Sequence, residues 1–213
     1  MKERPIIFSG PMVRAIIEGR KTQTRRVVKW PNLAMCSHVD RVVTAPYYNH
    51  GRKGEFVPLN GQGGIAIFER SVPCPYGVPG DRLWCREGAI YWTYADGRVG
   101  GCTPVVYQDD EQWDGALADS RKDPPYTVTN DFGWWKEQPP IYMPRRFSRL
   151  TLEVVSVRVE RLQAISEADK LAEGATPDVP FGTLWKKINI KPGIRWEDNP
   201  WVWVVEFKKL EAP

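Results

Sequence analysis

The feature that most constrains this chain is the junction at residues 18–26 (EGRKTQTRR), where a helix pattern ends and a strand pattern begins. Before the junction, apolar residues recur at the spacing of a short amphipathic helix, with Ser9 as a plausible N-cap and Pro11 in the first turn. Gly19 suits the left-handed conformation that ends a helix. After it, residues 21–28 alternate and are rich in Thr and Val, which predicts a strand.

The cations in this junction have two interpretations. Most charge clusters are solvated surface turns, and composition alone favours that interpretation. The other is an anion or nucleotide site in which a lysine lies close enough to a hydroxyl to activate it. Strict strand alternation places Lys21 and Thr24 on opposite faces, whereas a bend directly after the helix would turn Lys21 in beside Thr24. The sequence pattern by itself does not decide between the two interpretations of the junction.

Three motifs in this order resemble the ASCH family. They are the run beginning Gly19-Arg-Lys-Thr, the turn at residues 80–84 (GDRLW) and a closing strand at residues 201–207 (WVWVVEF). The Gly-Arg-Lys-Thr run is the most specific of them. The resemblance covers roughly residues 5–30, 75–90 and 145–208.

The resemblance implies an α+β fold, namely a small β-barrel related to the PUA domain and flanked by short helices. It predicts one domain over residues 1–213, with long insertions at about 31–74 and 91–142. The second insertion is too aromatic to be disordered, so we expect it to pack on the barrel and to supply one lid segment.

The alternation of apolar residues locates further elements. It predicts short strands at residues 41–44 and 65–68, a long strand at 150–161, and a short helix at 180–189. In the long strand, Val155, Val157 and Val159 are expected to share one face.

Some ASCH proteins are amidohydrolases that remove acyl groups from the N4 nitrogen of cytosine nucleosides. They use the Lys and Thr of a Lys-x-x-Thr motif and a Glu on a later helix, so the resemblance assigns these roles to Lys21, Thr24 and Glu173. A capping box at Ser166 opens a short helix that ends at Gly174. A carboxylate in its last turn is disfavoured by about 0.3–1 kcal/mol when exposed, which invites a functional explanation, although a harmless exposed Glu remains the alternative.

The chemistry of such a site makes one demand on Lys21. It can take the proton of Thr24 only as a neutral amine, so its pKa must fall by roughly three units from about 10.4. Burial and the neighbouring cations Arg20, Arg25 and Arg26 would lower it. Glu173 would then relay the proton to the leaving nitrogen.

Four residues complete the candidate substrate site. Arg26 and Arg20 are candidates for holding the substrate or a developing oxyanion. Residues 82–87 alternate as a half-buried strand. In the barrel of the ASCH family this strand helps to wall the ligand pocket, so the resemblance makes Trp84 and Glu87 candidates for contact with the substrate, and a tryptophan can stack on a base. A surface ion pair on the sheet is an equally open interpretation of Glu87.

Charge limits the class of partner. The chain carries 30 basic and 26 acidic residues, a formal net charge of +4. This mild excess suits a small nucleoside or nucleobase substrate better than a nucleic acid held by many phosphate contacts. A PUA-like module that binds RNA or a modified base, with or without ribonuclease activity, is the alternative function.

The sequence predicts a cytoplasmic protein without a metal or other cofactor. It has no secretory signal and no run that approaches the ~20 apolar residues of a membrane span. The four cysteines are irregularly spaced, so they are expected to be reduced thiols. Cys36, His38, His50 and Cys74 match no common zinc module. The oligomeric state is not predicted.

Overall fold

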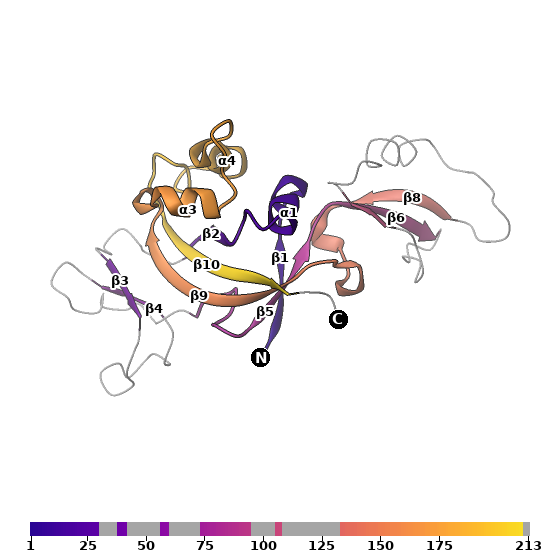
Figure 1. Cartoon of the computed structure of the whole chain (residues 1–213), viewed down its shortest axis with the longest axis horizontal. Helices are drawn as coiled ribbons and strands as arrows, with labels where there is room; N and C mark the ends of the chain where they lie inside the picture. Colours follow the sequence, from indigo (N-terminus) through magenta and orange to yellow (C-terminus); the bar gives the residue numbers. More distant parts are fainter. Residues whose placement is uncertain (30–37, 42–55, 60–72, 95–104, 108–132, 211–213) are drawn as a thin grey trace.

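A curved five-stranded mixed sheet forms the centre of the computed structural model, which describes residues 1–29, 38–41, 56–59, 73–94, 105–107 and 133–210 (Figure 1). The strand order is β1-β5-β9-β10-β2, with β1 parallel to β5 and the other pairs antiparallel. The strands are β1 (Glu3–Ile7), β2 (Gln23–Val27), β5 (Arg82–Arg86), β9 (Thr151–Arg161) and β10 (Trp201–Leu210). The long strand and the closing strand predicted from the sequence are both confirmed.

Strand β10 is buried on both faces, which explains its continuous apolar sequence. Trp201, Trp203 and Val205 belong to one hydrophobic cluster, which also contains residues of helix α1 (Gly10–Ile17). Val202 and Val204 belong to a second cluster, which contains residues of helix α4 (Phe181–Ile188). The two helices therefore cover opposite faces of the same strand.

The face predicted for the valines of β9 is wrong at one position. Val157 is buried, but Val155 is 50% exposed while its neighbour Val154 is buried. The register between β9 and β10 shifts at Glu206 and Phe207, so that Ser156 lies opposite Glu206 and Val154 opposite Phe207. This irregularity leaves Val155 without a partner in the ladder and reverses the alternation on either side of it.

The α+β class is confirmed, but the sheet is not closed into a barrel. Strands β1 and β2 are its two edges, and no backbone ladder joins them in the described residues. A side chain spans the gap instead, because the Arg26 guanidinium donates a hydrogen bond through Nη2 to the carbonyl of Ile7. The guanidinium also lies over the ring of Phe8, 5.3 Å from its centroid. The half-buried side chain of Arg26 thus links the two edges.

The helices begin and end close to the predicted positions. Gly19 has φ 77° and Gly174 has φ 87°, the left-handed conformation expected after α1 and after α3 (Glu167–Ala172). The Ser166 hydroxyl accepts a hydrogen bond from the Asp169 amide, as a capping box requires. Ser9 precedes α1 in an extended conformation, but its side chain makes no capping hydrogen bond. The predicted helix at 180–189 is α4.

The described parts of the two insertions are short sheets. In the first, β3 (His38–Arg41) pairs with β4 (Phe56–Leu59). Of the strand predicted at 41–44, only Arg41 is described, and it belongs to β3. Residues 42–44 and the strand predicted at 65–68 lie outside the described residues. In the second, β7 (Val105–Tyr107), β6 (Ala89–Tyr94) and β8 (Gly133–Gln138) form a sheet in that order. These three strands extend away from α3 and α4, so none of them is the expected lid (Figure 1).

The described residues also include three short 3-10 helices. Helices η2 (Pro140–Tyr142) and η3 (Arg145–Phe147) lie between β8 and β9, and η4 (Leu162–Ala164) lies between β9 and α3. Cys74 and Cys85 are buried free thiols, in agreement with the predicted reduced state for this pair. Within the ranges given above, no helix has the length and apolar character needed to cross a membrane.

Candidate active site

Lys21 and Glu173, 152 residues apart in the chain, form a buried ion pair. Lys21 Nζ donates hydrogen bonds to Glu173 Oε2 at 2.7 Å and to the Glu173 carbonyl at 2.8 Å. Their side chains are 1% and 5% exposed. The backbones meet as well, in an isolated antiparallel bridge between the two residues. The turn of chain between Gly19 and β2 supplies the bend that the sequence left open, and it directs Lys21 toward the end of α3.

Arg25 is a second buried cation of this site. Its side chain is 0% exposed and contacts three carboxylates. Nη1 donates to Glu173 at 3.2 Å, Nη2 donates to Asp169 at 3.1 Å, and Nε and Nη2 donate to Glu160 at 3.1 and 2.5 Å. Glu173 is therefore held by two cations, which offset its unfavourable position at the C-terminus of α3.

Burial lowers the pKa of Lys21 from its ordinary value, and this is the largest influence on that amine. The Glu173 carboxylate opposes the shift, both by its charge and by its hydrogen bond. Arg26 and Arg25 lower the pKa further. The direction is the one that a lysine acting as a base requires. Arg20, which was expected to contribute, is instead exposed and forms an ion pair with Glu18.

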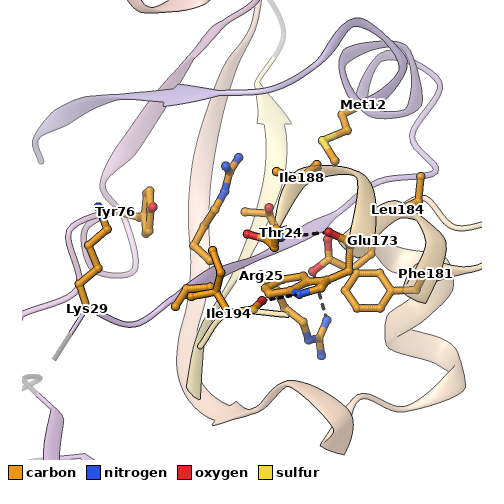
Figure 2. Close-up of a pocket in the computed structure, with 14 residues that line it drawn as sticks. Met12, Thr24, Arg25, Lys29, Tyr76, Glu173, Phe181, Leu184, Ile188 and Ile194 are labelled. Carbon is orange, nitrogen blue, oxygen red and sulfur yellow. Dashed lines mark hydrogen bonds and ion pairs between the residues drawn. The ribbon is translucent and has the colours of Figure 1, made fainter. Parts of the chain in front are cut away.

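Thr24 and Glu173 line one pocket, which has a volume of about 280 Å³. Figure 2 shows Tyr76 and Lys29 at one end of it and Phe181 and Leu184 at the other, with Thr24 between the two ends. Residues from five parts of the chain line the pocket. They belong to α1, to β2 and the short segment after it, to the turn before β5, to the end of α3, and to α4 with the segment that follows it. They are Met12, Thr24, Arg25, Arg26, Val27, Lys29, Tyr76, Glu173, Phe181, Leu184, Trp185, Ile188, Asn189 and Ile194.

Lys21 lies behind Glu173 and does not line this pocket. Its amine hydrogen bonds are made to Glu173, and none joins it to Thr24. For Lys21 to take the Thr24 proton, the amine must exchange one of these hydrogen bonds for the hydroxyl. Catalytic hydrogen bonds often tighten only when the substrate is bound, so this geometry is compatible with the predicted role.

Arg26 lines the pocket without a carboxylate partner among the described residues. Its Nε is buried and makes no hydrogen bond, while Nη2 donates to Ile7. Burial is the largest cause of the lowered pKa of Arg26. A buried donor without an acceptor is costly, by about 1–3 kcal/mol, and would gain most from an oxygen atom of a ligand.

Three of the predicted substrate-binding residues do not line the pocket. Arg20 is on the surface. Trp84 is 8% exposed and packs beneath the guanidinium of Arg86, 4.6 Å from its ring centroid. Glu87 accepts hydrogen bonds from Arg149, so it forms an ion pair, but a fully buried one and not the surface ion pair of the alternative interpretation. The structure thus brings together Lys21, Thr24, Glu173 and Arg26, and leaves the other three outside.

Sequence reasoning missed the role of Arg25 and the apolar wall of the pocket. Strand alternation set Arg25 on the face opposite Thr24, and nothing local marks its partners Glu160 and Asp169. The helix at 180–189 was predicted, but its contribution to a pocket wall was not. The helical spacing of Leu184 and Ile188, four residues apart on one face, was the available signal.

No cluster of three or more His, Cys, Asp or Glu side chains that could hold a metal ion occurs in the described part of the chain. Cys36 and His50 lie outside that part. Comparisons with protein-family models, with curated proteins and with solved structures find no match to this chain.

Proposed function

We propose that this protein is an ASCH-like, PUA-related amidohydrolase that removes acyl groups from the exocyclic N4 nitrogen of cytosine nucleosides or related cytosine derivatives. The observation that carries the proposal is the buried Lys21–Glu173 pair beside the Thr24 pocket. These are the three residues that the ASCH resemblance assigns to catalysis. A binding site alone has no need of a buried lysine with a lowered pKa that is paired with a carboxylate of the Thr24 pocket.

The first half of the reaction forms an acyl-enzyme. Neutral Lys21 takes the proton of the Thr24 hydroxyl while Thr24 Oγ1 attacks the acyl carbon. The carbonyl oxygen becomes an oxyanion beside the guanidinium of Arg26, whose Nε makes no hydrogen bond. The proton passes from Lys21 through Glu173 to N4, the carbon–N4 bond breaks, and the cytosine amine leaves.

The second half restores the enzyme. A water molecule attacks the acyl group on Thr24 and gives a proton to Lys21. The ester bond breaks, Thr24 recovers a proton, and the carboxylic acid leaves. The sum is amide plus water giving amine plus acid, with no cofactor. N4-acylated cytosine is an easier amide than a peptide, because the ring competes for the nitrogen lone pair.

The size of the pocket supports a small substrate. A volume of about 280 Å³ lies just below the roughly 300–1,000 Å³ that is typical of small-molecule sites. A polymer bound along its length would require an extended groove with aromatic platforms and many phosphate contacts instead.

The test is to incubate the protein with N4-acetylcytidine and to follow release of cytidine by chromatography. We expect turnover by the native chain and near-complete loss in Thr24→Ala, with measurable activity in Thr24→Ser. Arg20→Ala is the matched control, because Arg20 belongs to the same basic stretch but lies on the surface. An active Thr24→Ala variant would show that Thr24 is not the nucleophile, and an inactive native chain would refute the proposed substrate.

A further inference from the structure

The pocket has two chemically different ends on either side of Thr24. At one end lie Tyr76 and Lys29, and Lys29 is exposed (Figure 2). At the other end α4 presents an apolar wall. This wall consists of Phe181, Leu184, Trp185 and Ile188, together with Ile194 from the segment that follows.

Neighbouring residues of β2 define the two ends. Arg25 lies over the ring of Phe181, 6.0 Å from its centroid, and its charge is matched by carboxylates. Arg26 lies on the other side, near Tyr76. Burial raises the pKa of Tyr76, and the positive charge of Arg26 opposes that rise. The free positive charge is therefore at the Tyr76 end, and the α4 end is apolar with its cation neutralised.

The α4 wall is rigid where it meets the pocket. Trp185 is 4% exposed, and its indole N–H donates a hydrogen bond to the Ile194 carbonyl at 2.9 Å. Phe181 is 5% exposed and packs against Trp185 with a ring separation of 6.1 Å. The indole donor is thus already used, and the wall offers surface rather than hydrogen bonds to a ligand.

We infer that the α4 end of the pocket is the acyl-binding subsite, and that the substrates of this protein carry an extended apolar acyl group larger than acetyl. The inference rests on the proposed function. An N4-acylated cytosine has a polar half, the pyrimidine with any sugar, and an acyl half that is apolar beyond its carbonyl. With the carbonyl at Thr24, the polar half matches the Tyr76 and Lys29 end, which leads to solvent at Lys29. The acyl chain then extends along Leu184 and Ile188.

An acetyl group would leave most of this wall uncovered. Each further methylene group that is buried against the wall should raise kcat/KM about fourfold. Acetyl, propionyl and butyryl amides have similar carbonyl reactivity, so the series isolates the contribution of burial. We expect kcat/KM for N4-butyrylcytidine to exceed that for N4-acetylcytidine by about fifteenfold.

The variant that tests the subsite is Ile188→Trp. Ile188 lines the pocket but is 56% exposed, so a larger side chain can be accommodated without disturbing the core. It should fill the acyl end and reduce the butyryl-to-acetyl ratio to about one. Ile190→Trp is the matched control. Ile190 lies two residues further along, is 76% exposed and is not a pocket residue, so the ratio should be that of the native protein.

The outcomes separate the inference from the proposed function. Turnover of both amides with a ratio near one in the native chain overturns the inference and leaves the proposed function intact. An equal loss of both activities in Ile188→Trp also overturns it, because the pyrimidine would then lie on α4. If neither amide is hydrolysed, calorimetric titration with butyrate and acetate decides. Tighter binding of butyrate that is lost in Ile188→Trp supports an apolar subsite, and equal or absent binding of the two acids refutes it.

Discussion

Replacement of both members of the buried Lys21–Glu173 pair by methionine tests the centre of the site most directly. Methionine is unbranched, close to both residues in length, and adaptable in packing. The single variant Glu173→Met leaves the Lys21 amine 1% exposed, with one remaining acceptor, the carbonyl of residue 173. That amine must either stay charged without a carboxylate beside it or lose its proton.

The cost of the single variants can be estimated. Deprotonation of an amine with a reference pKa of about 10.4 at pH 7 costs at most about 4.6 kcal/mol, which is in the range of about 3–5 kcal/mol for breaking a buried pair. We expect Glu173→Met to lose about 3 kcal/mol, or roughly 6–12 °C in Tm for a chain of this length. Lys21→Met should lose less, because Glu173 keeps Arg25 at 3.2 Å.

The double variant should lose much less free energy of unfolding than the sum of the losses in the two single variants. Apolar replacement of both partners of a buried pair is often neutral or stabilising. Urea unfolding of the four proteins at pH 7 should therefore give a coupling free energy of at least about 2 kcal/mol. Additive losses, with a coupling below about 0.5 kcal/mol, would refute a direct interaction between the two side chains.

The pH dependence of Glu173→Met has a predicted sign. Without the carboxylate that opposes its shift, the pKa of Lys21 falls further in the folded protein. Between that lowered pKa and about 10.4 the unfolded chain binds one more proton than the folded chain, so stability rises with pH, by up to about 1.4 kcal/mol per unit. The free energy of unfolding of Glu173→Met should therefore increase as the pH rises from 7 to 9.5. A free energy of unfolding that stays constant over this range would contradict the burial of the amine.

Further predictions concern single residues. Lys21→Arg keeps the charge but cannot supply a neutral base, so hydrolysis should vanish while ligand binding measured by calorimetry remains. The larger side chain should also lower the free energy of unfolding, measured in urea, by about 1–3 kcal/mol because of overpacking. The native rate should rise with pH along one basic limb as Lys21 loses its proton, and a flat profile would argue against a lysine base. Arg25→Lys cannot serve three carboxylates at once and should lower kcat more than KM changes, as measured by steady-state kinetics. Binding of single-stranded RNA should be weak and vanish by about 200 mM salt in a titration, and nanomolar binding at that salt would favour the alternative function.

The sequence predicted the elements that carry the site because their ends have local causes. Gly19 and Gly174 both adopt positive φ, and each ends a helix next to a member of the ion pair. At 174 the positive φ rather than lack of space favours glycine, since a Cβ there would lie at ordinary contact distances, 3.5 Å from the Lys21 Cβ and 3.4 Å from that of Ala15. Such positions can be read from a few neighbouring residues.

The arrangement of side chains around β2 could not be read in that way. Gln23, Thr24 and Arg25 are consecutive and all buried, at 1%, 4% and 4% exposure. Alternation fails here because both sides of the strand are covered: Arg25 meets carboxylates of β9 and α3, while Thr24 opens into the pocket. The partners of Arg25 lie 135–148 residues away, so only the folded chain reveals them. The bulge that exposes Val155 and the gap between the sheet edges depend in the same way on long-range pairing.

A fold of this size has an apolar alternative to every buried ion pair, and that alternative is usually no less stable. The grouping of Lys21, Arg25 and Glu173 in and beside one pocket therefore requires a reason other than stability. If the reason is catalysis, the double methionine variant should fold well and hydrolyse nothing, although its acyl subsite on α4 is intact and still binds the product acid. If the pair served only to hold α3 against β2, the same variant would keep its turnover. Stability, turnover and butyrate binding measured on that one protein separate a catalytic pair from a structural one.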